Sequence, residues 1–135
     1  MKADIKIPNV ENVFLAAVAE WSDDFLENIW NVYIINDSDY LIDNVMVVSS
    51  ASGTIDGEMK KTSLLRHAFL EIPAVSVQKV EMIEKNVVQL NNEFMVTYFL
   101  NGSLYDKKFI FKKNFPDKEE IEEIPILFVD GFVVR

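Results

Sequence analysis

The chain is a 135-residue acidic polypeptide, a size that fits one domain with a core of its own. Half of its residues are apolar and 12% are aromatic, and this composition excludes a disordered, collagen-like or low-complexity chain. The formal net charge of −9 repels nucleic acid and anionic membranes at long range, so a nucleic-acid role would need a concentrated basic patch. We expect a single domain over residues 1–135.

Cysteine is absent, so the chain can build neither a disulfide framework, nor a thiolate metal site, nor a cysteine nucleophile. This absence fits a reducing cytoplasm. The longest apolar run, residues 13–19, is far shorter than the roughly 20 residues that span a bilayer. Pro8 and the acidic residues near Lys2 and Lys6 disfavour a signal peptide. We therefore expect a cytoplasmic protein without a membrane segment.

Apolar and polar residues alternate along most of the chain, and this period of two predicts antiparallel strands. Strands are expected at residues 30–36, 44–50, 63–72 and 75–84. Residues 12–21 contain three alanines and fit a strand or a helix; we expect a strand, because the neighbouring elements need a sheet partner. Residues 49–62 are rich in Ser, Gly, Lys and Thr and are expected to form the most mobile loop.

The clearest element is a hairpin centred on Asn101-Gly102, a dipeptide that favours a type I′ turn. If Leu100 opposes Ser103, one face of the hairpin is apolar and belongs in the core. That face carries Phe94, Val96, Tyr98, Leu100, Tyr105, Phe109 and Phe111. The other face is mixed, as expected for the outside of a sandwich, and it carries Phe99, Leu104 and Ile110.

The C-terminal part is expected to contain a short helix and a second hairpin. Residues 117–124 combine the potential cap Asp117 with acidic side chains, which favour a helix N-terminus. Residues 125–135 are apolar on both faces around Asp130-Gly131, so we expect a doubly buried hairpin. The predicted fold is an all-β, mostly antiparallel, immunoglobulin-like sandwich of about seven or eight strands with one short helix near the C-terminus.

Three aspartates, Asp37, Asp39 and Asp43, lie between two predicted strands and raise the question of a cation site. A calcium loop of the helix-loop-helix kind would need a ligand and a glycine where Leu41 and Ile42 stand. Asn and Asp side chains hydrogen-bond to nearby backbone amides, so the segment also fits a turn. We expect a turn that forms a hairpin or a corner between sheets, with an irregular cation site as the open alternative.

Catalytic signatures are missing from the sequence. His67 is the only histidine, the serines stand in no G-x-S-x-G or S-x-x-K pattern, and the four glycines form no nucleotide-binding loop. We therefore expect no enzymatic activity, no cofactor and no resident metal. A pocket that contains His67 and a carboxylate with a perturbed pKa would reopen the enzymatic hypothesis.

A basic cluster stands out against the acidic background, because four of the 13 basic residues fall close together. They are Lys107, Lys108, Lys112 and Lys113, and they are interleaved with Phe109 and Phe111. Many binders of single-stranded RNA combine aromatic residues on a sheet with flanking lysines. The alternative is that these lysines protect a strand from edge pairing, since the hairpin register points both phenylalanines to the core.

Four stretches resemble a family of small, uncharacterised bacterial proteins of about this length: WNVYIIN at 30–36, RHAF at 66–69, LNNEFMVTYF at 90–99 and DKKFIFKKN at 106–114. Some members of that family carry the label of a phenylalanyl-tRNA synthetase subunit, which would imply a connection with tRNA. The resemblance covers most of the chain and transfers no catalytic residue to it. The strand order is also similar to immunoglobulin-like sandwiches, a likeness that leaves function open.

Two hypotheses of function follow from these patterns. The first is a non-enzymatic cytoplasmic module that binds a protein partner or a second copy of itself, through Phe99, Leu104 and Ile110 or through the C-terminal hairpin. Its basis is apolar surface that one core would not absorb. The alternative is an RNA- or anion-binding domain that uses the four clustered lysines and whose binding weakens steeply with salt.

Overall fold

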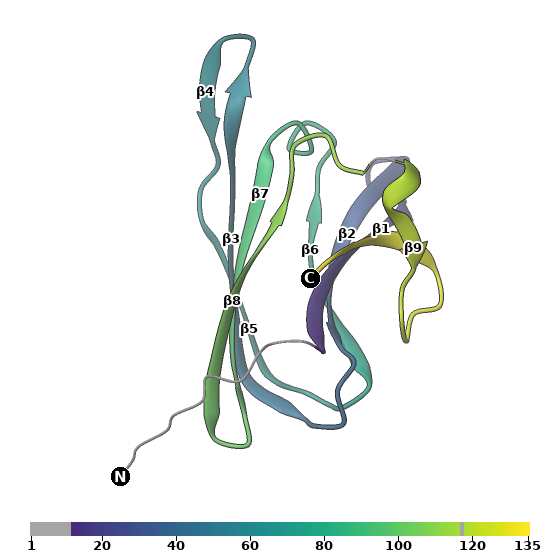
Figure 1. The fold of residues 1–135 in the computed structure, drawn as a ribbon. Coiled ribbons are helices and arrows are strands. Elements are labelled where there is room, and N and C mark those ends of the chain that lie inside the picture. Colours follow the sequence, from purple (N-terminus) through teal and green to yellow (C-terminus); the bar gives the residue numbers. More distant parts are fainter. Residues whose placement is uncertain (1–11, 117) are drawn as a thin grey trace.

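Ten strands form two antiparallel sheets in the computed structural model, which describes residues 12–116 and 118–135 (Figure 1). The first sheet has the order β6-β2-β1-β10-β9; the second has the order β4-β3-β7-β8, and β5 also pairs with β3. The strands are β1 (Val13–Ser22), β2 (Glu27–Asn36), β3 (Ile42–Ile55), β4 (Glu58–Lys61), β5 (Leu65–Ile72), β6 (Ser76–Ile83), β7 (Asn91–Leu100), β8 (Ser103–Phe111), β9 (Ile121–Glu123) and β10 (Asp130–Val134). The prediction of a mostly antiparallel all-β chain is confirmed, and so is the strand at residues 12–21, which β1 matches within one residue at each end.

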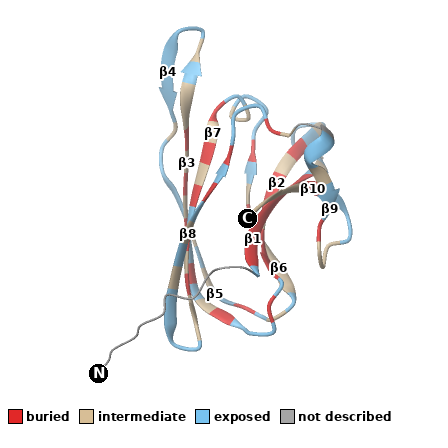
Figure 2. Cartoon of the chain, in the orientation of Figure 1, coloured by how far each residue is buried: buried red, intermediate tan, exposed pale blue. Residues whose placement is uncertain are grey.

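The core lies between the two sheets, because alternate side chains of each sheet point toward the other. Figure 2 shows buried residues concentrated on the central strands, whereas β4 is exposed along its whole length. Core residues that are at most 1% exposed include Leu15, Ala17, Val32 and Ile34 from the first sheet and Val47, Phe94, Val96, Phe109 and Phe111 from the second. One continuous hydrophobic cluster therefore joins the two sheets.

The hairpin of β7 and β8 forms in the predicted register. Leu100 lies opposite Ser103, and Asn101 and Gly102 take positive φ angles of 50° and 78°, as a type I′ turn requires. The predicted core face is buried at Phe94, Val96, Tyr98, Phe109 and Phe111 and partly buried at Leu100 and Tyr105.

The prediction of a loop at residues 49–62 is wrong for most of that segment. β3 continues to Ile55, and β4 pairs back onto it with Glu58 opposite Ile55. Asp56 and Gly57 form the turn, with positive φ angles of 52° and 79°. An Asp-Gly pair favours a hairpin turn, but the polar residues on either side of this pair led to the prediction of a loop. Figure 1 shows the resulting hairpin projecting beyond the rest of the second sheet.

The short helix expected at residues 117–124 is also not found. The segment forms one 3₁₀ turn, Lys118–Glu120, followed by β9, and the described part of the chain contains no α-helix. A stretch this short before Pro125 forms a stable helix only with help from packing. Pairing with β10, with Ile121 opposite Phe132, satisfies its backbone instead. The expected cap Asp117 lies outside the described residues.

Among the described residues, no helix is long and apolar enough to cross a membrane.

The chain turns at residues 125–129 and not at Asp130-Gly131, which begin β10. Phe128 N–H donates to the Ile124 carbonyl over 2.9 Å and closes this turn. Ile124 is buried, but Phe128 is 74% exposed, so the expected double burial holds only in part. The expected position of this hairpin turn was therefore wrong.

Gly131 is required by close packing at this point. A Cβ atom there would lie 2.6 Å from the backbone oxygen of Ala17 and would also collide with the side chain of Ile124. We expect Gly131→Ala to lower the free energy of unfolding by about 2–3 kcal/mol, because the Ala17 backbone cannot move aside without disturbing β1. Urea denaturation measures the change. Gly53→Ala is the control, since its Cβ would meet the flexible Leu90 side chain at 3.3 Å, and an equal loss in both variants would contradict this account.

Residues 37–41 form the corner that carries the chain from β2 in the first sheet to β3 in the second. The fully buried Asn36 side chain organises it. Its Nδ2 donates to the backbone oxygens of Tyr40, Ile72 and Pro73 over 2.9, 3.2 and 2.9 Å, and its Oδ1 accepts from Ser38. This side chain ties β2 to the start of β3 and to the end of β5, so the predicted turn is confirmed as a sheet-to-sheet corner.

Candidate functional site

β8 is an edge strand, because it pairs with β7 and no other described strand pairs with its second side. Phe109 and Phe111 point into the core, so the residues that alternate with them point outward. The outward positions are Leu104, Asp106, Lys108 and Ile110, all of them exposed. Such an edge offers free backbone N–H and C=O groups to another strand.

The structure brings together two of the three residues expected to contact a protein. Phe99 on β7 lies directly opposite Leu104, which is 55% exposed. Ile110 is 40% exposed on the same outward face, but it lies near the other end of β8. Met46 and Met95 are also exposed on this face. Met95 belongs to the hairpin face that was predicted to be mixed, whereas Met46 was not singled out, although it alternates with buried residues of β3.

The basic cluster is divided between surfaces. Lys107 lies on the core side of β8, with its ammonium 5.4 Å from the centre of the Phe109 ring, whereas Lys108 points outward and lies 4.0 Å from Glu93 Oε1. Phe109 and Phe111 are at most 1% exposed. They therefore cannot stack on nucleic-acid bases without unfolding the core.

Lys112 and Lys113 follow the end of β8. Together with Ile110, Arg135 and Glu120 they line a hollow of about 540 Å³. The four lysines thus form no single basic face with exposed aromatic rings. RNA or anion binding stays a prediction, and no arrangement of these side chains favours it over a role in protecting the strand edge.

The three aspartates of the corner do not converge. Asp37 and Asp39 are exposed, and Asp43 is half-buried at the start of β3. Across residues 12–116 and 118–135, no group of three His, Cys, Asp or Glu side chains is placed to hold a metal ion. Polar contacts of Asn36 and Ser38, and not these carboxylates, hold the corner together.

His67 lies in a polar cluster that bridges the two sheets. Ser49 on β3 and His67 on β5 belong to the second sheet, and Glu81 on β6 belongs to the first. Ser49 Oγ donates to Glu81 Oε1 over 2.5 Å, and His67 Nε2 lies 2.9 Å from the same oxygen. A serine activated by histidine would need a hydrogen bond between those two residues, and the described residues show none. The cluster is therefore a Glu81 carboxylate that Ser49 and His67 hold in place.

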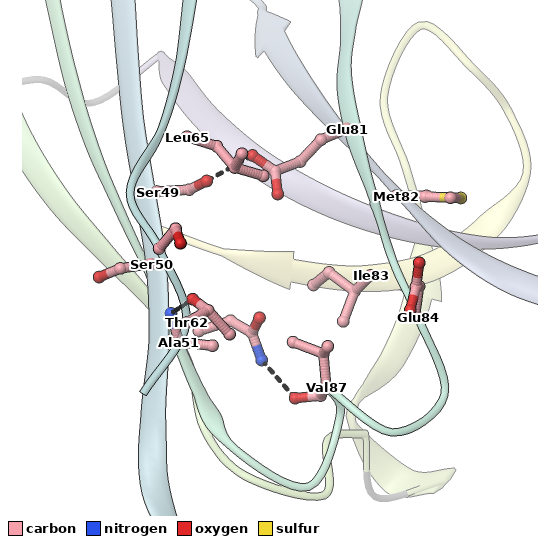
Figure 3. Close-up of a pocket in the computed structure, with 12 residues that line it drawn as sticks. Ser49, Ser50, Ala51, Thr62, Leu65, Glu81, Met82, Ile83, Glu84 and Val87 are labelled. Carbon is pink, nitrogen blue, oxygen red and sulfur yellow. Dashed lines mark hydrogen bonds between the residues drawn. The ribbon is translucent and has the colours of Figure 1, made fainter. Parts of the chain in front are cut away.

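A pocket of about 420 Å³ opens beside this cluster, between the edges of the two sheets (Figure 3). Glu81 reaches into it from β6 and Ser49 from β3, and Figure 3 shows the hydrogen bond between them. The sequence reading singled out His67 but neither Ser49 nor Glu81. These residues come from three separate strands, so no local motif connects them.

A comparison with models of known protein families, with curated proteins and with solved structures finds no match to this chain. The resemblance to small bacterial proteins therefore stays a prediction, and with it the connection to tRNA. Function has to be inferred from the exposed edge of β8 and from the pocket between the sheets.

Proposed function

We propose that this chain is a non-enzymatic, cytoplasmic interaction module that self-associates, with β8 of one copy paired antiparallel to β8 of a second copy. The observation that carries the proposal is the outward face of β8, which presents Leu104, Asp106, Lys108 and Ile110 in that order. An apolar, acidic, basic, apolar series is complementary to itself when it is read in the opposite direction. The natural partner of this edge is therefore the same edge in another copy.

A two-fold axis at Lys107 brings the complementary residues opposite one another. Asp106 then faces Lys108 of the second copy, and Leu104 faces Ile110 of the second copy, and each pair occurs twice. Directly opposed pairs of opposite charge contribute about 0.2–1 kcal/mol each, and apolar contacts add to them. These pairs supplement the backbone hydrogen bonds that the free edge of β8 can form.

Lys107 acts against this association, because like charges directly opposite each other on neighbouring strands destabilise the pairing. Its contact with the Phe109 ring holds the ammonium along its own strand and offsets part of the repulsion. We therefore expect a weak and reversible dimer. The same lysine disfavours pairing with apolar strands of other proteins, which protects the edge from aggregation.

The strand order supports an immunoglobulin-like sandwich as the framework of this module. β1, β2 and β6 are neighbours in the first sheet, and β5, β3, β7 and β8 are neighbours in the second. Immunoglobulin domains combine strands A, B, E and D in one sheet with C, F and G in the other, and the variable type adds C′ to the second sheet. The described strands follow this chain order without a counterpart of strand D. The pair of β9 and β10, which extends the first sheet beyond β1, is an addition to that plan.

Charge reversal on β8 tests the proposed pairing. We expect Asp106→Lys to raise the dissociation constant of the dimer at least about tenfold, because two attractive pairs become two repulsive ones. Lys108→Asp should have the same effect. The double variant Asp106→Lys/Lys108→Asp exchanges the charges, restores their complementarity and should recover the dimer. Sedimentation velocity over a wide range of protein concentrations measures each constant.

Asp39→Lys, which reverses an exposed charge at the corner between β2 and β3 and outside β8, serves as the control and should leave the dimer unchanged. A wild-type protein that stays monomeric at every concentration would overturn the proposal. Single variants that dimerise as tightly as the wild type would place any self-association on another surface. A double variant that fails to recover would rule out the register centred on Lys107.

A further inference from the structure

We infer that the pocket between β3 and β6 binds a small organic ligand that carries an ammonium group. Its volume of about 420 Å³ lies within the usual range of small-molecule sites, about 300–1,000 Å³. The walls come from both sheets, so a ligand there would contact the two layers at once. The inference is independent of the pairing through β8, which is separated from β3 by β7.

Glu81 supplies the group that recognises the ammonium. The register of β2 and β6 shifts between Val32 and Tyr33, and Glu81 stands opposite the buried Val32, on the side of the first sheet that faces the second. Its side chain is only 13% exposed. Ser49 Oγ and His67 Nε2 both lie within hydrogen-bond distance of Glu81 Oε1. Within the described residues, Glu81 Oε2 has no hydrogen-bond partner. A largely buried carboxylate with one free oxygen forms strong charge-assisted hydrogen bonds with N–H donors.

The charge of the pocket selects a cation over an anion. Glu81 and Glu84 line it, and its described lining includes no lysine or arginine. The net charge of −9 for the whole chain acts in the same direction. A bare metal ion fits less well, because the part of the chain that the structure describes holds no group of three metal-ligating side chains.

The rest of the pocket suits an apolar body attached to the ammonium. Leu65, Ile83 and Val87 contribute apolar surface, and Figure 3 shows Ile83 and Val87 beside the space below Glu81. A few fixed polar groups within an apolar lining are typical of sites for small organic molecules. A ring or short chain that carries one primary amine would match both parts.

Benzylamine and benzyl alcohol form a matched pair of probes, because they share the apolar ring and differ in the cationic group. In a titration followed by protein amide NMR shifts, we expect benzylamine to shift residues 49–51, 81–84 and Asn92 and to bind at least about tenfold more tightly than benzyl alcohol. Glu81→Gln should remove that preference. Glu71→Gln removes an exposed carboxylate at the end of β5 and should leave the preference unchanged.

Equal binding of the two probes to the wild-type protein would overturn the inference, and so would benzylamine shifts that avoid the pocket or are absent. This comparison needs no variant, so it decides the question even if Glu81→Gln fails to fold. A folded Glu81→Gln protein that keeps the full preference for benzylamine would also overturn it. None of these results depends on whether the protein dimerises through β8.

Discussion

Replacement of Asn36 by alanine is expected to lower the free energy of unfolding by about 4 kcal/mol. The Asn36 amide is fully buried and donates to the backbone oxygens of Tyr40, Ile72 and Pro73, while its oxygen accepts from Ser38. Alanine would remove all of these hydrogen bonds at the corner between the sheets, although the Tyr40 and Pro73 oxygens still accept from the hydroxyl groups of Ser38 and Ser76. Each hydrogen bond contributes about 0.5–1.5 kcal/mol to stability, so these four together account for the expected loss.

Urea denaturation followed by tryptophan fluorescence measures this loss. Asn28→Ala, at an exposed position of the same strand, is the control and should change the unfolding free energy by less than about 0.5 kcal/mol. Asn36→Asp keeps the shape of the side chain but removes both N–H donors, so it should be at least as harmful as alanine. A loss of less than about 1 kcal/mol in Asn36→Ala would show that water replaces these hydrogen bonds.

Phe111→Ala is expected to be equally destabilising, with a loss of about 3–5 kcal/mol. The Phe111 side chain is 0% exposed, and its ring centre lies 5.6 Å from Phe94, 5.2 Å from Phe115 and 6.0 Å from Phe132. It therefore joins β7, the segment after β8, and β10 of the other sheet. Truncation removes buried apolar area and leaves a cavity that three rings cannot fill without separating the sheets.

The same denaturation experiment tests this second prediction, with Phe128→Ala as the matched control. Phe128 is 74% exposed, so its truncation should change the free energy of unfolding by less than about 0.5 kcal/mol. Phe111→Leu should fall between the two, because leucine keeps part of the buried area. If both alanine variants lost the same stability, the core would not be centred on the rings around Phe111.

Local signals predicted the hairpin of β7 and β8 in full. Asn101-Gly102 supplies the positive φ angles of the turn, and the alternation on either side determines which residues face the core. The same alternation identifies Leu104 and Ile110 as outward residues of β8. The self-complementary order on this edge was readable in the sequence, but that β8 lies at the edge of its sheet was not.

Residues 117–124 show where local propensity was insufficient. Their acidic residues and potential cap favour a helix, yet β9 pairs with β10, and Ile124, which follows β9, is buried in the core. The Asp130-Gly131 pair predicted a turn, but the structure requires glycine at position 131 because a side chain there would collide with Ile124 and with the backbone of Ala17. The first outcome depends on pairing with β10, and the second depends on the space beside Ala17 of β1, which is distant in sequence.

The sequence by itself therefore determined the mostly antiparallel all-β class, the central hairpin and the turn after Asn36, because turn geometry and two-residue alternation act between near neighbours. Only the tertiary structure decided the neighbours of each strand and the meeting of Ser49, His67 and Glu81. The hydrogen bond between Ser49 and Glu81 spans 32 positions and joins different sheets. Contacts of this kind arise from the burial of whole sheet faces, a driving force that is proportional to area and carries no information about the order of residues in the chain.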